Sequence, residues 1–416
     1  MKMKFVYFAV LCVATLFMTG CSSSSNDEPS TPSSDALEVV SSTDMQPSEI
    51  IGLLTQYAPS AAPVLEESRA SGSYMALINA KMQILGLTSV KSDVVRFKSV
   101  GKDGAELYQT GKIYIPQQTS PLRGIIIANH YTITQNSEAP SQTFQLEGAA
   151  SLLGYAVVMA DYIGFGETKA MPQTYLCADL TAHSSVDLAL CTYKYLNDMG
   201  YKFVYADNEV YNEGYSQGGE VALAVQKLIE SEYADKFTIR KTFAGAGPYD
   251  IAATFKTMIA NNNSPISAVM PLTFIAMNYY YGLNLDFSKY FKEPLLSNYD
   301  KWINSKDYNT TQIDGLLGTT KVDAILTANA LNPDAAEMKT MNETFEKNSL
   351  VKWSPKAPIA LFHSTTDNVV PDLNSKEAYE YFKANSSATV TFDNADYGSH
   401  YTAALQFYMK YALAIY

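Results

Sequence analysis

Histidine and cysteine are both scarce in this chain, with four of each in 416 residues. They are the side chains from which proteins most often build zinc sites, and the sequence has neither an H-E-x-x-H motif nor paired cysteine ligands. It also lacks the G-x-x-x-x-G-K-[ST] loop that holds phosphates. We therefore expect no metal and no cofactor.

Positive charge is in short supply as well. Lysine and arginine number 30 against 42 aspartates and glutamates, which gives a formal net charge of −12 and an isoelectric point near 4.9. An acidic surface repels the phosphates of nucleic acids and of anionic lipid headgroups. The composition argues against a nucleic-acid partner and against binding to an anionic membrane surface.

Residues 1–20 are typical of a secretory signal peptide. Two lysines near the start precede the apolar run 5–17, which is too short for a lasting membrane helix. Residues 18–21 then resemble a bacterial lipoprotein processing site, except that Met18 stands where leucine is usual. The resemblance implies export, lipidation of Cys21, and an N-terminal lipid anchor on the periplasmic or cell-surface side. Ordinary cleavage by signal peptidase is the alternative.

Residues 21–35 are polar and rich in serine and proline, so we expect a flexible tether there. Two cysteines remain for the folded part, Cys177 and Cys191. An exported protein can form a disulfide between them. On one continuous helix they would be about 21 Å apart, at 1.5 Å per residue, which is too far to bridge. A disulfide would require a helix break, for example near Thr181.

The order of predicted strands and helices indicates an α/β protein. Apolar positions at helical spacing predict an N-terminal helical extension over 36–93. Two alternating strands, 94–100 and 107–115, form an antiparallel hairpin, and the apolar run 124–130 is typical of a strand buried on both faces. The later elements alternate as in a parallel sheet wrapped by helices on both faces. They are expected at 144–153 (helix), 156–161 (strand), 185–198 (helix), 209–215 (strand), 220–230 (helix), 238–245 (strand), 357–363 (strand), 373–383 (helix), 388–392 (strand) and from 401 (helix).

The alternation is interrupted over 250–350, a stretch too long for an unstructured loop. We expect a helical cap here, inserted between the sixth and seventh strands of a core formed by 94–249 and 351–416. The stretch is rich in aromatic residues, which include Phe255, Phe274, Tyr279, Tyr280, Tyr281, Phe287, Tyr290, Phe291, Tyr299, Trp302 and Tyr308. These side chains either line an apolar substrate pocket or form the core of the cap itself.

The motif Gly214-Tyr-Ser-Gln-Gly218 lies between a predicted strand and a predicted helix. A serine on such a sharp turn is exposed for nucleophilic attack, and glycines on either side allow the helix to pack close to the strand. The alternative is a glycine-rich turn in which Ser216 only caps the helix.

A serine hydroxyl becomes a nucleophile when a base takes its proton and a third group orients the base. The four histidines are His130, His183, His363 and His400, of which the last two follow Ser216 in the chain. His363 ends a predicted strand and Asp367 lies on the loop after it, while His400 follows the final strand. The carboxyl ends of parallel strands meet at one edge of a sheet, so Ser216, Asp367 and His400 should converge there.

In these features the chain resembles the α/β-hydrolases, in which the triad follows the order Ser, Asp, His. The resemblance covers about 94–416 and rests on Gly214–Gly218, His363–Pro371, His400 and Asp161–Gly166. It is closest to secreted lipases and esterases with a helical cap. It implies Ser216 as nucleophile, His400 as general base and then acid, and Asp367 as orienting carboxylate.

Simpler roles stay open for these residues. Asp367 could be a helix N-terminal residue, and His400 could begin a helix and bond to backbone. Asp393 and Asp396 are alternative carboxylates, although they lie very close to His400 in the sequence.

An oxyanion formed during acyl transfer needs preorganised hydrogen-bond donors. The backbone N–H of Gln217 is one candidate. The second should come from the loop after the strand ending at His130, where Tyr131 and Thr132 replace the His-Gly pattern common in the family. Either residue is expected to supply this N–H.

The resemblance implies a serine hydrolase that acts on a small-molecule or lipid ester. A serine peptidase of the same fold is the first alternative, and it would need acidic side chains for a substrate amine, for which Glu209 and Glu213 are candidates. A surface lipoprotein that binds glycans or lipids without catalysis is the second.

Overall fold

The computed structural model describes residues 37–416 except 58–72 and 206–207. The predicted signal peptide, Cys21 and the tether lie outside the described residues. Among those described, no helix combines the length and apolarity that crossing a membrane requires.

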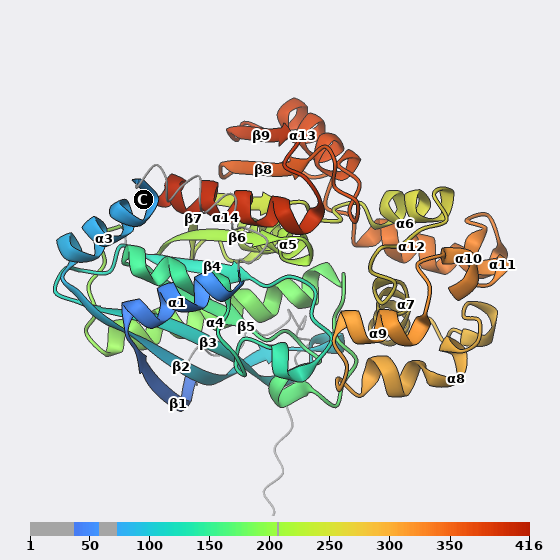
Figure 1. Ribbon diagram of the computed structural model, residues 1–416, viewed down its shortest axis with the longest axis horizontal. Helices are drawn as coiled ribbons and strands as arrows, with labels where there is room; N and C mark the ends of the chain where they lie inside the picture. The colour runs from blue at the N-terminus through green and yellow to red at the C-terminus, as the bar shows by residue number, and fades with distance from the viewer. Residues whose placement is uncertain (1–36, 58–72, 206–207) are drawn as a thin grey trace, which may run out of the picture. The chain divides into compact units, whose positions relative to one another are not determined.

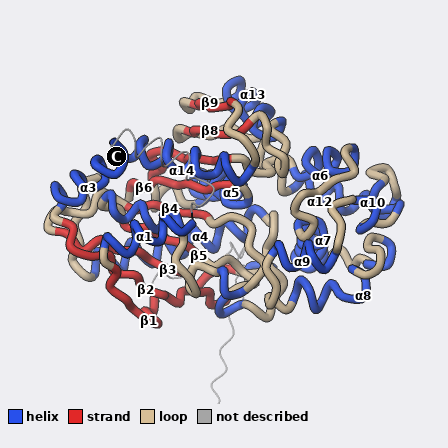
Figure 2. Tube along the Cα trace, in the orientation of Figure 1, coloured by secondary structure: helices blue, strands red, loops and turns tan. Residues whose placement is uncertain are grey.

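A nine-stranded mixed sheet forms the centre of the fold (Figures 1 and 2). Its strand order is β1-β2-β3-β5-β4-β6-β7-β8-β9, antiparallel from β1 to β5 and parallel from there on. The strands are β1 (Leu37–Met45), β2 (Leu87–Val100), β3 (Glu106–Gln118), β4 (Ile125–Asn129), β5 (Ala156–Ala160), β6 (Glu209–Tyr215), β7 (Thr238–Gly245), β8 (Ile359–Ser364) and β9 (Val390–Ala395). The predicted α/β-hydrolase sheet, with an antiparallel N-terminal hairpin followed by parallel strands, is confirmed.

Helices cover both faces of this sheet, each over its own hydrophobic cluster. Helices α4 (Ala178–Asp198) and α5 (Gln217–Glu232), with α13 (Leu373–Asn385), contribute to one cluster. Helices α1 (Pro47–Tyr57), α3 (Ser73–Leu85) and α14 (His400–Ile415) contribute to the other. The central strands β4 and β5 are buried at every position, as their unbroken apolar sequences predicted.

The N-terminal part differs from the expectation of helices alone over 36–93. Strand β1 pairs with β2 along most of its length, and β2 already begins at Leu87. Most side chains of β1 are exposed, so backbone pairing rather than burial holds this edge strand, and its sequence carries little alternation. Because β1 precedes the strands predicted from the sequence, each later strand has a number one higher than predicted. The insertion predicted between the sixth and seventh strands therefore lies between β7 and β8.

Two further expectations differ in detail. The helix predicted at 144–153 is a 3₁₀-helix, Leu146–Leu153, in which a Cβ on Gly148 would lie 2.6 Å from the Tyr114 ring. Helix α4 begins at Ala178 and runs unbroken past Cys191, so Cys177 lies just before it; both cysteines are buried, and they form no disulfide.

The chain between β7 and β8 forms a group of helices, here called the cap segment (residues 250–350; Figure 1). Its α-helices are α6 (Ile251–Ala260), α7 (Val269–Tyr281), α8 (Leu295–Tyr299), α9 (Thr310–Leu317), α10 (Val322–Ile325), α11 (Ala328–Leu331) and α12 (Lys339–Lys347). They enclose a third cluster, in which Phe274 touches several aromatic rings, so most of the predicted aromatic residues form the core of the segment. Phe255 belongs to this cluster and also lines a cavity beside Ser216.

Candidate active site

Ser216 occupies the turn between β6 and α5 with φ 59° and ψ −124°. Non-glycine residues rarely adopt positive φ, so the surrounding structure must hold this strained conformation. A Cβ on Gly214 would lie 2.1 Å from the Gly218 carbonyl oxygen, and one on Gly218 would lie 2.0 Å from the Asn129 carbonyl oxygen. Close approach of backbone to backbone therefore requires glycine at both positions.

Three loops bring Ser216, Asp367 and His400 together at the carboxyl ends of β6, β8 and β9. His400 Nε2 lies 2.9 Å from Ser216 Oγ, and His400 Nδ1 lies 2.6 Å from Asp367 Oδ2. A carboxylate can only accept, so Nδ1–H donates to Asp367 and the Nε2 lone pair faces the serine hydroxyl. This tautomer can take a proton from Ser216.

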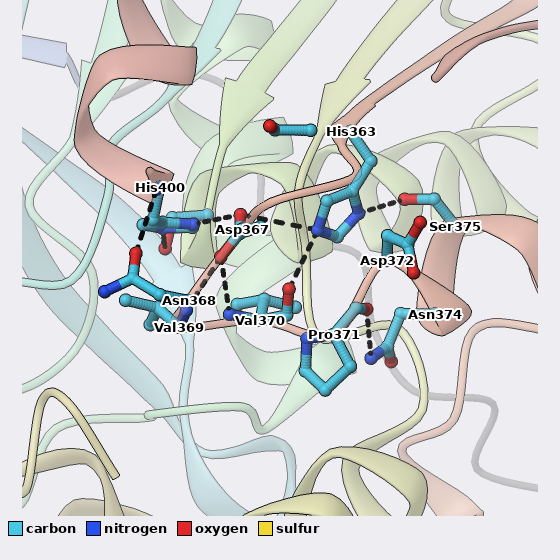
Figure 3. Close-up of polar contacts among 12 residues, drawn as sticks. His363, Asp367, Asn368, Val369, Val370, Pro371, Asp372, Asn374, Ser375 and His400 are labelled. Carbon is cyan, nitrogen blue, oxygen red and sulfur yellow. Dashed lines mark hydrogen bonds and ion pairs between the residues drawn. The ribbon is translucent and has the colours of Figure 1, made fainter. Parts of the chain in front are cut away.

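The Asp367 carboxylate, on the loop after β8, is fully buried (Figure 3). Its Oδ1 accepts hydrogen bonds from the backbone N–H groups of Val369 at 2.8 Å and Val370 at 2.9 Å. Burial alone would raise the pKa of this carboxyl, but hydrogen bonds from His363 and His400 outweigh burial and hold the pKa well below its usual range. Asp367 therefore remains ionised beside the imidazole.

The second imidazole near Asp367 belongs to His363, whose side chain is fully buried at the end of β8. His363 Nε2 lies 3.4 Å from Asp367 Oδ2 and 3.0 Å from the Val370 carbonyl oxygen, while Nδ1 lies 2.7 Å from Ser375 Oγ (Figure 3). The sequence placed His363 at a strand end but gave it no role. The spacing His363-x-x-x-Asp367 is the signal that could have indicated this contact.

The start of α14 is fixed by its neighbours, which sets the position of His400. Ser399 caps the helix by accepting from the Thr402 N–H. The Tyr215 hydroxyl, one residue before the serine, donates to the His400 carbonyl oxygen at 2.8 Å. The His400 N–H donates to Asn368 Oδ1 at 3.2 Å, so the backbone of His400 is tied to both other loops.

Gln217 and Thr132 line one cavity together with Ser216. Gln217 is the first residue of α5, where backbone N–H groups have no helical acceptor and carry the positive end of the helix dipole. Tyr131 is 41 % exposed and lies outside this set of lining residues. Of the two residues expected to supply the second donor, Thr132 is thus the better placed.

His130 supports the loop that carries Thr132. Its buried imidazole stacks on Tyr162 at 3.9 Å between ring centroids, with Nδ1 2.7 Å from the Tyr131 carbonyl oxygen. Nε2 lies 3.2 Å from the Asp161 carbonyl oxygen. Burial lowers the pKa of His130 to about 4, so the ring is neutral at ordinary pH and holds the loop by packing and hydrogen bonding.

The cavity beside Ser216 is narrow and apolar, with a volume of about 50 Å³. Helices α6, α7 and α12 of the cap segment supply much of its wall, and Val369 and Val370 supply another part. Its lining includes Leu176, Ile251, Phe255, Met258, Ile266, Val269, Met270 and Phe345. Such a wall suits a hydrocarbon chain.

The acidic candidates for an amine site lie elsewhere. Glu209, at the start of β6, forms an ion pair with Arg240. Glu213, within β6, is fully buried, and burial raises its pKa well above the usual value. The described lining of the cavity contains no carboxylate.

Asp393 and Asp396, the alternative orienting carboxylates, are engaged by other groups. Asp393 accepts from the Tyr397 hydroxyl at 2.6 Å and pairs with Lys410. Asp396 accepts from Thr366 Oγ1 at 2.6 Å. Within the part of the chain that the structure describes, histidine, cysteine and acidic side chains form no group of three or more that could hold a metal ion.

Residues 142–413 match the family described as secretory lipase, which spans more than half of the chain. The chain belongs to this family and is a hydrolytic enzyme of the lipase and esterase type. A comparison with curated proteins gives no match.

Solved structures resemble this one over most of its length. The rice cell wall degrading esterase LipA from Xanthomonas oryzae is 19 % identical, with a TM-score of 0.68 over 81 % of this chain and 92 % of that chain. A candidate hydrolase from Legionella pneumophila is 18 % identical, with a TM-score of 0.74 over 91 % and 97 %. Lipase A from Candida antarctica is 17 % identical, with a TM-score of 0.59 over 75 % and 73 %. At these identities the likeness establishes the fold.

Proposed function

We propose that this member of the secretory lipase family hydrolyses carboxylic esters through an acyl-enzyme formed on Ser216. The observation that carries the proposal is the continuous hydrogen-bonded chain from Ser216 through His400 to Asp367, at the wall of an apolar cavity. Each member has the partner that its role requires, and the serine is held by a strained turn that packing enforces.

In the first half of the reaction, Ser216 Oγ attacks the carbonyl carbon of the ester while His400 Nε2 takes the hydroxyl proton. The backbone N–H groups of Gln217 and Thr132 stabilise the resulting oxyanion. When the tetrahedral intermediate collapses, the imidazolium gives its proton to the departing alcohol oxygen. The acyl group then remains on Ser216.

The second half repeats these roles with water. His400 Nε2 removes a proton from the water as its oxygen attacks the acyl carbon, and then returns the proton to Ser216 Oγ as the acid departs. Asp367 stays ionised throughout, because its low pKa keeps a negative charge beside the imidazolium in both steps.

The cavity indicates which part of the ester it receives. An apolar wall favours the acyl chain, and a volume of about 50 Å³ holds only a short one unless the helices of the cap segment move apart. We propose a short-chain ester of a small molecule or lipid as the preferred substrate. The structural relatives named above are described as a rice cell wall degrading esterase and a lipase.

The serine peptidase alternative is weaker, because Glu209 and Glu213 are engaged or buried away from the cavity. Nitrophenyl esters with acyl chains of several lengths, compared with aminoacyl anilides, separate the two activities. We expect turnover of acetyl or butyryl esters, lower turnover of palmitoyl esters, and negligible hydrolysis of anilides. Faster hydrolysis of the anilides would favour the peptidase.

A fluorophosphonate probe tests the nucleophile and the non-catalytic alternative together. Wild-type protein should be labelled with a stoichiometry of about one, as expected for one activated serine. Ser216→Ala should abolish both labelling and ester turnover. Ser231→Ala, at an exposed serine on the same helix, is the matched control and should behave as wild type. An unlabelled but folded wild-type protein would support a binding lipoprotein instead.

We also propose that a lipid on Cys21 anchors the exported enzyme, with residues 22–35 as the tether. The signal-like residues 1–20 and the secretory family support export. Expression of the full chain in bacteria fed a radiolabelled fatty acid should label the wild type and leave Cys21→Ser unlabelled. A soluble, unlabelled wild-type protein with an N-terminus other than residue 21 would indicate ordinary cleavage.

A further inference from the structure

Asp367 is shared by two imidazoles rather than one. In Figure 3 the carboxylate lies between His400 on one side and His363 on the other. Both rings approach the same oxygen, Oδ2, with nitrogen atoms at 2.6 Å for His400 and 3.4 Å for His363. The other oxygen already accepts two backbone N–H groups, so the carboxylate is held on every side.

The partners of His363 determine its tautomer. Nε2 faces two acceptors, the Val370 carbonyl oxygen and Asp367 Oδ2, and must therefore carry the hydrogen. Nδ1 faces Ser375 Oγ at 2.7 Å, so the hydroxyl donates to the Nδ1 lone pair. Ser375, on the first turn of α13, thus orients the ring so that the Nε2–H faces both the Val370 carbonyl oxygen and the triad carboxylate.

We propose that His363 is a positioning residue for ester hydrolysis, which acts through Asp367 and whose ring is itself oriented by Ser375. This inference rests on the proposed function of Ser216, His400 and Asp367. His363 lies outside the cavity lining and contacts neither the nucleophile nor the base, so it has no direct contact with the reacting atoms.

Two physical effects follow from the second imidazole. The Nε2–H restrains rotation of the carboxylate, which keeps Oδ2 in line with His400 Nδ1. It also withdraws negative charge from Oδ2, which weakens the pull of Asp367 on the imidazolium form of His400. Without His363, the carboxylate gains freedom to rotate and also favours the protonated form of His400 more strongly.

Few other titratable groups face this pair of imidazoles. Tyr215 approaches Asp367 from β6, and burial raises its pKa far above the usual value, so it stays neutral. Tyr249, on the loop after β7, stays neutral for the same reason. Asp372 is partly exposed and forms an ion pair with Lys376 at 2.6 Å. Asp396 is exposed and accepts a hydrogen bond from Thr366. The contacts between Asp367 and the two imidazoles should therefore determine how the site responds to pH.

His363→Leu and His363→Gln separate positioning from packing. The Gln amide nitrogen can occupy the place of Nε2 and still donate, whereas Leu fills the space without a donor. We expect kcat for a short nitrophenyl ester to fall about ten- to a hundredfold in the Leu variant, the range for losing a hydrogen bond to a charged group. KM should change little. The Gln variant should recover most of kcat.

The pH profile gives a readout that simple loosening of the fold would not produce. The acid limb of kcat/KM reports the protonated base in the free enzyme. Because the carboxylate in His363→Leu holds the imidazolium more strongly, this limb should move to higher pH. Ser375→Ala, which removes the hydrogen bond that orients the His363 ring and keeps the ring itself, should shift the limb in the same direction by less.

Asn374→Ala is the matched control. Asn374 is buried on the first turn of α13, beside Ser375, and holds the preceding loop through the Pro371 carbonyl oxygen and the Asp250 N–H, while its hydrogen bonds involve neither His363 nor Asp367. This variant should lower the unfolding temperature and leave the acid limb in place. If His363→Leu and Ser375→Ala behave like Asn374→Ala, the inference is wrong. If Ser216→Ala hydrolyses esters as fast as wild type, the proposed function itself is wrong.

Should His363→Leu fail to fold, Ser375→Ala and His363→Gln decide the matter. An unshifted acid limb in folded Ser375→Ala, together with a His363→Gln variant as slow as a triad deletion, would overturn the role assigned to His363. A shifted limb in Ser375→Ala with preserved KM would support it.

Discussion

On one side of Ser216 Oγ lies His400, whose two ring nitrogens contact Ser216 and Asp367, and a Cβ on either flanking glycine would lie within about 2.1 Å of a backbone oxygen. On the other side lies a cavity whose wall is mostly apolar and is formed in large part by helices of the cap segment. In the first region the position of each polar atom matters, because every donor must face an acceptor. In the second region mainly the total volume of the side chains matters, because apolar contacts have no direction. Substitutions should therefore have abrupt effects in the first region and graded effects in the second.

The largest effect is expected from Asp367→Asn. The amide can donate to His400 Nδ1 and so favour the tautomer that presents a hydrogen, rather than a lone pair, to Ser216. In a well-studied serine protease this change lowers kcat about 10⁴-fold, and we expect a similar loss here. Steady-state kinetics with a short nitrophenyl ester measure it.

Asp372→Asn is the matched control, because Asp372 begins the next helix and pairs with Lys376 instead of His400. It should retain kcat within about threefold, as is usual for an exposed ion pair. A loss smaller than tenfold in Asp367→Asn would remove this carboxylate from the proposed mechanism.

Gly218→Ala should have the next largest effect, and on stability. The added Cβ would lie 2.0 Å from the Asn129 carbonyl oxygen, so either β4 or the start of α5 must move. We expect the free energy of unfolding to fall by about 3 kcal/mol or more, with activity lost as the turn shifts. Chemical denaturation and fluorophosphonate labelling measure the two consequences.

The control for that change lies in the cap segment. Gly315, within α9, has open space where a Cβ would be placed. Gly315→Ala should leave activity unchanged and raise the free energy of unfolding by up to about 1 kcal/mol, because alanine favours the helix. If Gly218→Ala and Gly315→Ala changed the free energy of unfolding and the activity to the same extent, the proposed difference between the turn and the cap segment would be wrong.

Glu220→Gln tests how much stability the turn at Ser216 and the start of α5 lose because they bury a carboxyl group. Glu220 lies on the first turn of α5, and burial, with a smaller contribution from Asp179, raises its pKa to about 8. The folded state thus keeps a proton that the unfolded state releases near pH 4.3. Stability from this group is therefore present at low pH and is lost as pH rises from about 4.3 towards 8.

A glutamine needs no proton and avoids this loss. The free energy of unfolding of Glu220→Gln relative to wild type should be near zero at pH 4 and should rise to a few kcal/mol at pH 8. Urea titrations at several pH values measure the trend. Glu232→Gln, at an exposed position on the same helix, should show little pH dependence. A constant difference across pH would contradict the assignment of a neutral Glu220.

The same contrast explains how much could be predicted from the sequence. The turn around Ser216 was predictable because backbone contact leaves a signature, glycine, in the sequence. Because the chain has only four histidines, few residues could be the base that partners Ser216. The structure places His400 beside Ser216 and Asp367 beside His400. The contact between His363 and Asp367 was missed, because a histidine at a strand end can face many partners.

Other features were beyond sequence reasoning for physical reasons. Strand β1 has few buried side chains, so pairing that involves only backbone left no pattern to read. The ion pair of Glu209 with Arg240 joins residues on neighbouring strands whose register the sequence does not specify. The width of the cavity depends on how the helices of the cap segment pack. The sequence does not distinguish apolar residues that line the cavity from those that form the core of the segment.

The smallest effect is expected within that wall, from Val269→Phe. Val269 lines the cavity at the start of α7 and is only partly buried, so a larger ring can enter the cavity without straining the core. Turnover of acetyl esters should stay near wild type, while kcat/KM for octanoyl esters should fall about tenfold, the usual cost of a poorly fitting apolar group. Leu316→Phe, at an exposed position on α9, should leave this ratio unchanged. An unchanged ratio in Val269→Phe would mean that the acyl chain binds elsewhere, and the cavity would then no longer account for substrate choice. A moderate change in the ratio of octanoyl to acetyl turnover, compared with the large losses in Asp367→Asn and Gly218→Ala, would support the contrast between the two regions around Ser216. Directional hydrogen bonds and close backbone contacts determine the first region, and apolar volume determines the second.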